Sequence, residues 1–202
     1  MKSIIFSLLI LCSSIATATN NVLIIGDSLS ASYGVEENKS WSALIKENLH
    51  KEYPGYYLIN ASISGETSNG GLSRLPELLK KYQPRILIIE LGANDGLQGL
   101  PIQVIENNLS QMIRLGKKSG SQILLVGIRI PENLGPTYTQ RFTAIYPKLA
   151  EQEKVLLLPN LLEGIDENPE LFQEDALHPN QQAQSSISAN IWDKLSILLK
   201  IH

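Results

Sequence analysis

Cysteine is almost absent from the sequence, with Cys12 the one example among 202 residues. A single cysteine cannot form a disulfide within the chain or supply a cysteine cluster for a metal. No H-E-x-x-H motif or comparable ligand spacing takes its place. The sequence therefore predicts a fold stabilised by its hydrophobic core, and a function that needs no metal ion and no cofactor.

Concentrated charge is absent as well. The formal net charge is −3, and the longest basic runs are pairs such as Lys80-Lys81 and Lys117-Lys118. Phosphate backbones require concentrated positive charge, so we expect no nucleic-acid partner. With 43% hydrophobic and 18% charged residues, the composition is that of a globular protein and excludes a disordered or fibrous chain.

The first 18 residues differ from the rest of the chain. Lys2 precedes an apolar run at residues 4–11, and Ala16-Thr17-Ala18 offers a small-residue cleavage site. This pattern predicts a secretory signal peptide over residues 1–18. No later stretch approaches the roughly 20 apolar residues of a membrane-spanning helix. One domain is expected over residues 19–202.

Cys12 raises the alternative of a lipid-anchored lipoprotein. Leu11 stands just before it, where a lipoprotein cleavage site requires a small residue. We therefore expect a periplasmic or secreted monomer without a stable membrane anchor.

Short apolar runs alternate with stretches of helical period along the chain. Near-continuous apolar strands of this kind are typical of a parallel sheet that is buried on both faces. The sequence predicts an α/β fold, a three-layer α/β/α sandwich around a five-stranded parallel sheet. The predicted strands are residues 22–25, 58–60, 86–91, 123–128 and 155–158, with helices over the apolar positions of 41–49, 72–79, 102–113 and 187–198.

Ser28 directly follows the first predicted strand, in Gly26-Asp27-Ser28-Leu29-Ser30. This position lies at the carboxyl edge of the sheet, where open α/β folds bind ligands. We expect a helix to begin there, with free N–H groups suited to an oxyanion. Taken alone, the segment fits an ordinary serine N-cap equally well.

Asp175 precedes His178 by three residues, just before the C-terminal helix. This spacing lets the carboxylate accept the Nδ1 proton of the imidazole while Nε2 faces a nucleophile. The alternative is an Asx turn that carries a surface histidine.

Gly65 follows the second predicted strand, and Asn94 follows the third. A glycine N–H and an asparagine amide can both donate to one oxyanion, although each also suits a routine turn. Four such segments at one sheet edge favour the catalytic interpretation.

The sequence resembles the GDSL, or SGNH, hydrolases, whose four blocks are matched by Ser28, Gly65, Asn94 and His178. The resemblance extends through Arg74-Leu75-Pro76 and residues 145–150. In these segments the sequence is similar to the multifunctional periplasmic thioesterase/protease/lysophospholipase branch of the family. It implies a flavodoxin-like fold, a triad of Ser28, His178 and Asp175, and an oxyanion hole formed by Ser28, Gly65 and Asn94. The expected substrates are acyl esters and thioesters.

Two positions depart from that branch, since Ala93 and Ala176 stand where glycine is usual. Neither change removes a functional group, but Ala176 restricts the backbone of the triad loop.

For the acyl chain, Leu97 and Leu134 are the candidate substrate-binding residues, in loops after the third and fourth strands. Simple loop packing explains either residue as well. Two other functions stay open, a carbohydrate O-deacetylase on the same scaffold and a non-catalytic binding module.

Overall fold

The structure is a computed structural model that describes residues 20–201. The predicted signal peptide and Cys12 lie outside the described residues. Within residues 20–201, the strands are β1 (Asn21–Gly26), β2 (Tyr57–Asn60), β3 (Ile86–Glu90), β4 (Gln122–Val126) and β5 (Leu156–Leu158). The α-helices are α1 (Trp41–Glu52), α2 (Ser68–Tyr82), α3 (Ala93–Leu97), α4 (Ile102–Lys118), α5 (Pro136–Thr143), α6 (Ile145–Glu153) and α7 (Gln184–Leu199). Short 3-10 helices are η1 (Glu37–Lys39), η2 (Glu132–Leu134), η3 (Pro169–Leu171) and η4 (Gln181–Ala183).

The five strands form one parallel sheet in the order β2-β1-β3-β4-β5. The α/β fold class and the five-stranded parallel sheet are therefore confirmed, and the order is the flavodoxin-like one. After β1 the chain moves outward to β2 and then returns to the other side of β1. Such a reversal opens a crevice at the carboxyl ends of the strands, at the end of β1. Ser28 lies two residues beyond that end.

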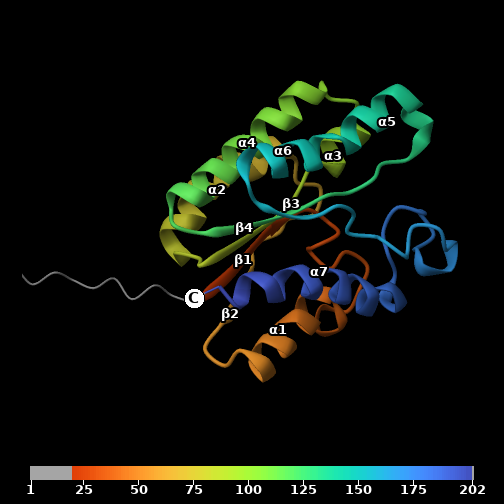
Figure 1. The fold of residues 1–202 in the computed structure, drawn as a ribbon. Helices are drawn as coiled ribbons and strands as arrows, with labels where there is room; N and C mark the ends of the chain where they lie inside the picture. Colours follow the sequence, from red (N-terminus) through yellow and green to blue (C-terminus); the bar gives the residue numbers. More distant parts are fainter. Residues whose placement is uncertain (1–19, 202) are drawn as a thin grey trace, which may run out of the picture.

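Helices cover both faces of the sheet (Figure 1). α1 and α7 lie on one face, whereas α2, α4 and α6 lie on the other. β3 is buried at every position, which explains why its sequence is apolar from Ile86 to Ile89 rather than alternating. Within the described residues, no helix is long and apolar enough to cross a membrane.

The segment between β4 and β5 contains two helices that the periodicity did not predict. α5 begins at Pro136 and α6 at Ile145, with a break at Ala144. Pro147 lies in the first turn of α6 and has no N–H to donate to the carbonyl of Thr143. The proline therefore divides what would otherwise be one amphipathic helix into two short ones.

Candidate active site

Ser28 lies in a series of turns after β1, and the prediction that a helix begins there is wrong. The next α-helix begins only at Trp41. The Asp27 carboxylate accepts a hydrogen bond from Leu29 N at 3.0 Å, and the Asp27 carbonyl accepts from Ala31 N at 2.9 Å. These bonds close one helical turn, which does not continue as a helix because Ser32 adopts a left-handed φ of 62°. The turns, rather than a helix terminus, place Ser28 at the sheet edge.

Three predicted residues form a continuous hydrogen-bonded chain. His178 Nε2 lies 2.9 Å from Ser28 Oγ, and His178 Nδ1 lies 2.7 Å from Asp175 Oδ2. A carboxylate only accepts hydrogen bonds, so Nδ1 carries the proton and Nε2 accepts from the serine hydroxyl. This is the tautomer in which the imidazole can act as a base toward Ser28.

Asp175 is held as an anion by the loop that contains it. Its Oδ1 accepts hydrogen bonds from His178 N at 3.0 Å and Leu177 N at 2.9 Å. These two backbone bonds, with the His178 side chain, lower the pKa of Asp175 to about 2. An Asx turn is therefore present, but it accompanies the contact with the imidazole rather than replacing it.

Ala176 occupies a strained position in this loop, with a φ of 56°. Left-handed backbone costs an L-residue about 1–2 kcal/mol, while glycine adds about 0.4–1 kcal/mol of unfolded-state entropy. We therefore expect Ala176→Gly to stabilise the fold by up to about 1 kcal/mol in urea unfolding. Ala144→Gly is the matched control, because Ala144 is exposed with a φ of −69°, and it should destabilise. If Ala176→Gly had a lower free energy of unfolding than the wild-type protein, the interpretation that Ala176 is strained would be wrong.

Two backbone N–H groups near Ser28 are free to bind an oxyanion. Within residues 20–201, neither Ser28 N nor Gly65 N donates a hydrogen bond to the protein. Gly65 has a φ of 79°, while a Cβ there would meet no atom within 4 Å. Backbone conformation rather than crowding therefore explains the glycine.

Asn94 lies in the first turn of α3, whose N-cap residue is the positive-φ Gly92. Its Nδ2 donates to the Glu66 carbonyl at 3.0 Å and faces Asp27 Oδ2 at 3.3 Å. The contact with Asp27 is the longer of the two, so the amide hydrogen that faces Asp27 is the more available for a ligand. Both contacts point the amide toward the loops that follow β1 and β2.

A pair of buried carboxyl groups lies beneath these loops. Asp27 is 0% exposed and Glu90, at the end of β3, is 1% exposed. Glu90 Oε2 accepts from Ser30 Oγ at 2.6 Å and from Asp27 N at 3.4 Å. Burial raises the pKa of Asp27 to about 6 and the pKa of Glu90 well above its usual range, and the charge of Asp27 adds to the latter effect.

The Asp27 shift predicts a pH dependence of stability. The unfolded carboxyl releases its proton near pH 3.8 and the folded one near pH 6, so stability falls as the pH rises between these values. Asp27→Asn does not titrate and should lose less stability over that interval, by up to about 3 kcal/mol. Urea unfolding at pH 4, 5, 6 and 7 measures the difference. Parallel pH curves for the two proteins would contradict the shift.

Two residues that the sequence did not single out hold the triad loop in place. The rings of Tyr33 and His178 lie 4.5 Å apart between centroids. Gln173 Nε2 donates to the Tyr33 carbonyl at 2.9 Å and the Pro179 carbonyl at 3.1 Å, which ties the serine turns to the histidine loop. Gly34 leaves room for this side chain, since a Cβ there would overlap Gln173. No local pattern predicts the contacts of Tyr33 with Gln173 and His178, because these partners are far apart in sequence.

The two leucines proposed for acyl binding, Leu97 and Leu134, lie outside the group of residues around Ser28 and His178. Leu97 is 39% exposed at the end of α3, whereas Leu134 packs against the hydrophobic core from η2. Neither lines the small cavity beside Ser28 and His178. Among residues 20–201, no group of three histidine, cysteine, aspartate or glutamate side chains could hold a metal ion.

Comparison with known proteins identifies the family. The model of the GDSL-like lipase/acylhydrolase family matches residues 24–185. This chain belongs to the GDSL-like lipase/acylhydrolase family. The family resemblance and the enzyme class predicted from the sequence are thereby confirmed, and the protein is a GDSL-type acyl hydrolase.

Relatives of this GDSL-type hydrolase span nearly its full length. It is 45% identical to an arylesterase of Vibrio mimicus over 93% of this chain and 94% of that protein. It is 43% identical to thioesterase 1/protease 1/lysophospholipase L1 of Escherichia coli (strain K12), over 91% of this chain and 86% of that protein. The psychrotrophic esterase EstA of Pseudoalteromonas sp., in a structure inhibited by monoethylphosphonate, superposes with a TM-score of 0.84 at 39% identity, over 89% of this chain and 98% of that one.

Proposed function

We propose that this GDSL-type hydrolase cleaves acyl esters and thioesters with Ser28 as nucleophile, His178 as general base and Asp175 as the acid of the triad. The observation that carries the proposal is the pair of contacts at 2.9 and 2.7 Å that joins Ser28 Oγ to His178 and His178 to Asp175. A serine hydroxyl is a weak nucleophile at neutral pH, so it needs a base at hydrogen-bond distance.

In the first half of the reaction, Ser28 Oγ attacks the acyl carbonyl carbon while its proton passes to His178 Nε2. The carbonyl oxygen becomes an oxyanion, and Asp175 stabilises the imidazolium through Nδ1. Collapse of the tetrahedral intermediate breaks the bond to the alcohol or thiol, which leaves with the proton from Nε2. Ser28 then carries the acyl group as an ester.

In the second half, water takes the place of the leaving group. His178 removes a proton from the water as the water oxygen attacks the acyl carbonyl carbon. Collapse of the second tetrahedral intermediate then breaks the bond between that carbon and Ser28 Oγ, and His178 Nε2 returns the proton to Oγ. The products are the carboxylic acid and the free enzyme. Water is the only co-reactant that the reaction requires.

The oxyanion would bind to Ser28 N–H, Gly65 N–H and the Asn94 amide. The backbone groups have no other acceptor among residues 20–201. Asn94 would exchange its 3.3 Å contact with Asp27 for the oxyanion and keep its 3.0 Å bond to Glu66. Each preorganised donor typically contributes about 3–4 kcal/mol to stabilising the transition state.

The relatives and the N-terminal sequence support the choice of substrate and location. An arylesterase and a thioesterase/lysophospholipase are related along almost the whole chain. An esterase of similar fold is inhibited by a phosphonate, a reagent class that reacts with activated serines. We place the mature enzyme, as a monomer, in the periplasm or outside the cell. The acyl chain of its substrate would contact Leu97 and Leu134.

Turnover of p-nitrophenyl esters with acyl chains of graded length, alongside acetylated xylan, tests the proposed function. We expect the purified mature protein to hydrolyse the p-nitrophenyl esters, with higher kcat/KM for medium or long chains than for acetate. Acetate release from xylan at a greater kcat/KM than any p-nitrophenyl ester would favour a deacetylase. If the protein turned over neither the p-nitrophenyl esters nor acetylated xylan, a non-catalytic binding module would be the remaining interpretation.

A further inference from the structure

Residues 61–66 join the edge strand β2 to α2 and contain Gly65, one of the proposed oxyanion donors. The segment reaches the end of β1, because Ile63 N donates to the Gly26 carbonyl at 3.0 Å. It continues as a loop, so neither a strand nor a helix fixes the position of the Gly65 N–H. Side-chain contacts must do so instead.

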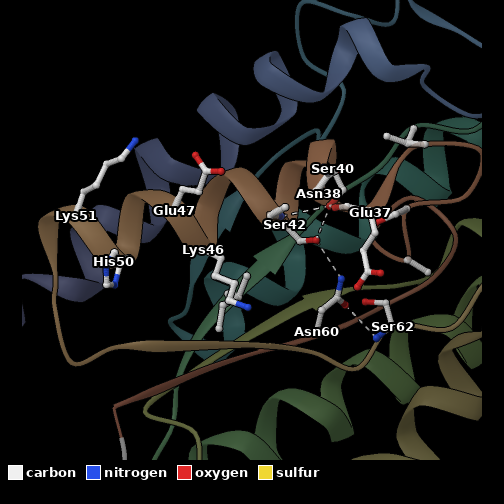
Figure 2. A pocket seen from close by; sticks show the side chains of 15 residues that line it. Glu37, Asn38, Ser40, Ser42, Lys46, Glu47, His50, Lys51, Asn60 and Ser62 are labelled. Carbon is white, nitrogen blue, oxygen red and sulfur yellow. Dashed lines mark hydrogen bonds between the residues drawn. The ribbon is translucent and has the colours of Figure 1, made fainter.

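Asn60, the last residue of β2, fixes the start of this loop (Figure 2). Its Oδ1 accepts a hydrogen bond from Ser62 N at 3.1 Å. Its Nδ2 donates to the Ser30 carbonyl at 2.7 Å and to Ser42 Oγ at 3.2 Å. These bonds tie the end of β2 to the serine turns and to α1. They end at Ser62, three residues before Gly65, so the rest of the loop needs another support.

Arg74 on α2 supplies that support. Its Nε donates to Glu66 Oε2 at 2.7 Å, and its Nη2 donates to the Ala61 carbonyl at 3.0 Å. Nη2 also lies 2.6 Å from Glu66 Oε2. The two acceptors stand at the two ends of residues 61–66, so one planar guanidinium closes the loop. Gly70 leaves room for the ion pair, since a Cβ there would overlap Glu66 Oε1.

Glu66 also contacts the second donor loop. Its carbonyl accepts a hydrogen bond from Asn94 Nδ2 at 3.0 Å. Glu66 directly follows Gly65 in the chain, so one residue is linked both to the backbone that bears the Gly65 N–H and to the Asn94 amide. A shift of Glu66 would therefore displace two of the three proposed donors.

We propose that Arg74 is a positioning residue of the oxyanion hole, which acts through Glu66 and does not touch the substrate. The inference rests on the proposed function, because an oxyanion forms here only if Ser28 attacks an acyl carbonyl. An ion pair near the surface contributes little to stability. Displacement of a catalytic group by about 1 Å, in contrast, can lower a rate by about a hundredfold. The main effect of Arg74 is therefore on kcat.

Arg74→Met tests the proposal, because it removes the guanidinium and retains an unbranched side chain. Arg114→Met is the matched control. Arg114 Nε donates to Glu153 Oε1 at 2.7 Å, and the Glu153 side chain is 11% exposed, as is that of Glu66. The control pair joins α4 to the end of α6, shortly before β4 and β5 begin, so it lies at the opposite edge of the sheet from Ser28.

We expect Arg74→Met to lower kcat for p-nitrophenyl laurate by about thirtyfold with little change in KM, and Arg114→Met to stay within about twofold of wild type. Arg74→Lys, which retains the charge but not the fork, should show a smaller loss than Arg74→Met and replaces it if that variant does not fold. Wild-type kcat per folded molecule in the Arg74 variant would overturn the proposal.

A trifluoromethyl ketone with a long alkyl chain provides a readout that a purely structural role would not change. Ser28 Oγ adds to its carbonyl carbon, the Ser28 proton passes to His178, and the carbonyl oxygen becomes an oxyanion. The inhibition constant, measured per folded molecule, should rise in Arg74→Met by about the same factor as kcat falls. An unchanged inhibition constant would mean that Arg74 does not position the oxyanion donors.

A double-mutant cycle with Glu66→Met tests whether Arg74 acts through Glu66. We expect the double variant to lose at most about twofold more kcat than Arg74→Met alone, because both changes break the same ion pair. Losses that multiply would show independent effects and overturn the proposal. Absence of p-nitrophenyl laurate turnover by the wild-type enzyme would instead overturn the proposed function itself.

Discussion

Replacing Ser28 with alanine is expected to lower kcat for ester and thioester hydrolysis by more than about a thousandfold. The variant removes the oxygen that lies 2.9 Å from His178 Nε2, so no group remains to form the acyl-enzyme. Ser28 is partly exposed, and its loss leaves no cavity in the core. The melting temperature should therefore stay within a few degrees of wild type, and steady-state kinetics with thermal unfolding measure both quantities.

Ser64→Ala is the matched control for this variant. Ser64 is an exposed serine beside Gly65, and its hydroxyl forms no hydrogen bond among residues 20–201. We expect its kcat to stay within about twofold of wild type. If Ser28→Ala retained more than a thousandth of the wild-type rate, with the same substrate profile, Ser28 would not be the nucleophile.

Asn94→Ala is expected to lower kcat by about a hundredfold or more with little change in KM, because the interaction with the oxyanion forms in the transition state. The amide also holds the Glu66 carbonyl at 3.0 Å, so a small loss of stability accompanies the kinetic loss. Kinetics at several substrate concentrations separate kcat from KM. A fall in melting temperature with unchanged kcat per folded molecule would make Asn94 a structural residue.

Asp95 is the neighbour that separates these two roles. It is fully buried, and its carboxylate accepts from Ser68 N at 2.8 Å and Ser68 Oγ at 2.5 Å, at the start of α2. Asp95→Ala leaves these donors unpaired and should cost about 2–3 kcal/mol of stability. We therefore expect Asp95→Ala to act mainly on the melting temperature and Asn94→Ala mainly on kcat. Equal losses of both kinds at both positions would contradict the oxyanion role.

The sheet was predictable from sequence because its strands are buried on both faces. Each of the five apolar runs coincides with a strand, to within one or two residues at either end. β3 is the clearest case, since every position is buried and apolar up to Glu90. Parallel pairing then places all carboxyl ends at one edge, which is why Ser28 and Asn94 were expected near one another.

Features set by single side chains or by distant contacts were not predictable in the same way. The expected helix after β1 is absent because Asp27 closes a single turn and Ser32 adopts a positive φ. The ring contact of Tyr33 with His178 joins positions that are far apart in the chain. Burial likewise decides the role of Asp95, which the sequence showed only as the acid next to Asn94.

Covalent labelling tests most directly whether Ser28 is the activated nucleophile. The wild-type enzyme is treated with a fluorophosphonate until p-nitrophenyl ester turnover stops, and peptides are then mapped by mass spectrometry. We predict one phosphonyl adduct per chain, on Ser28, at a rate reduced to background in His178→Ala, because the serine then lacks the base at 2.9 Å. Inactivation with the adduct on another residue, or undiminished labelling of Ser28 in His178→Ala, would contradict the account.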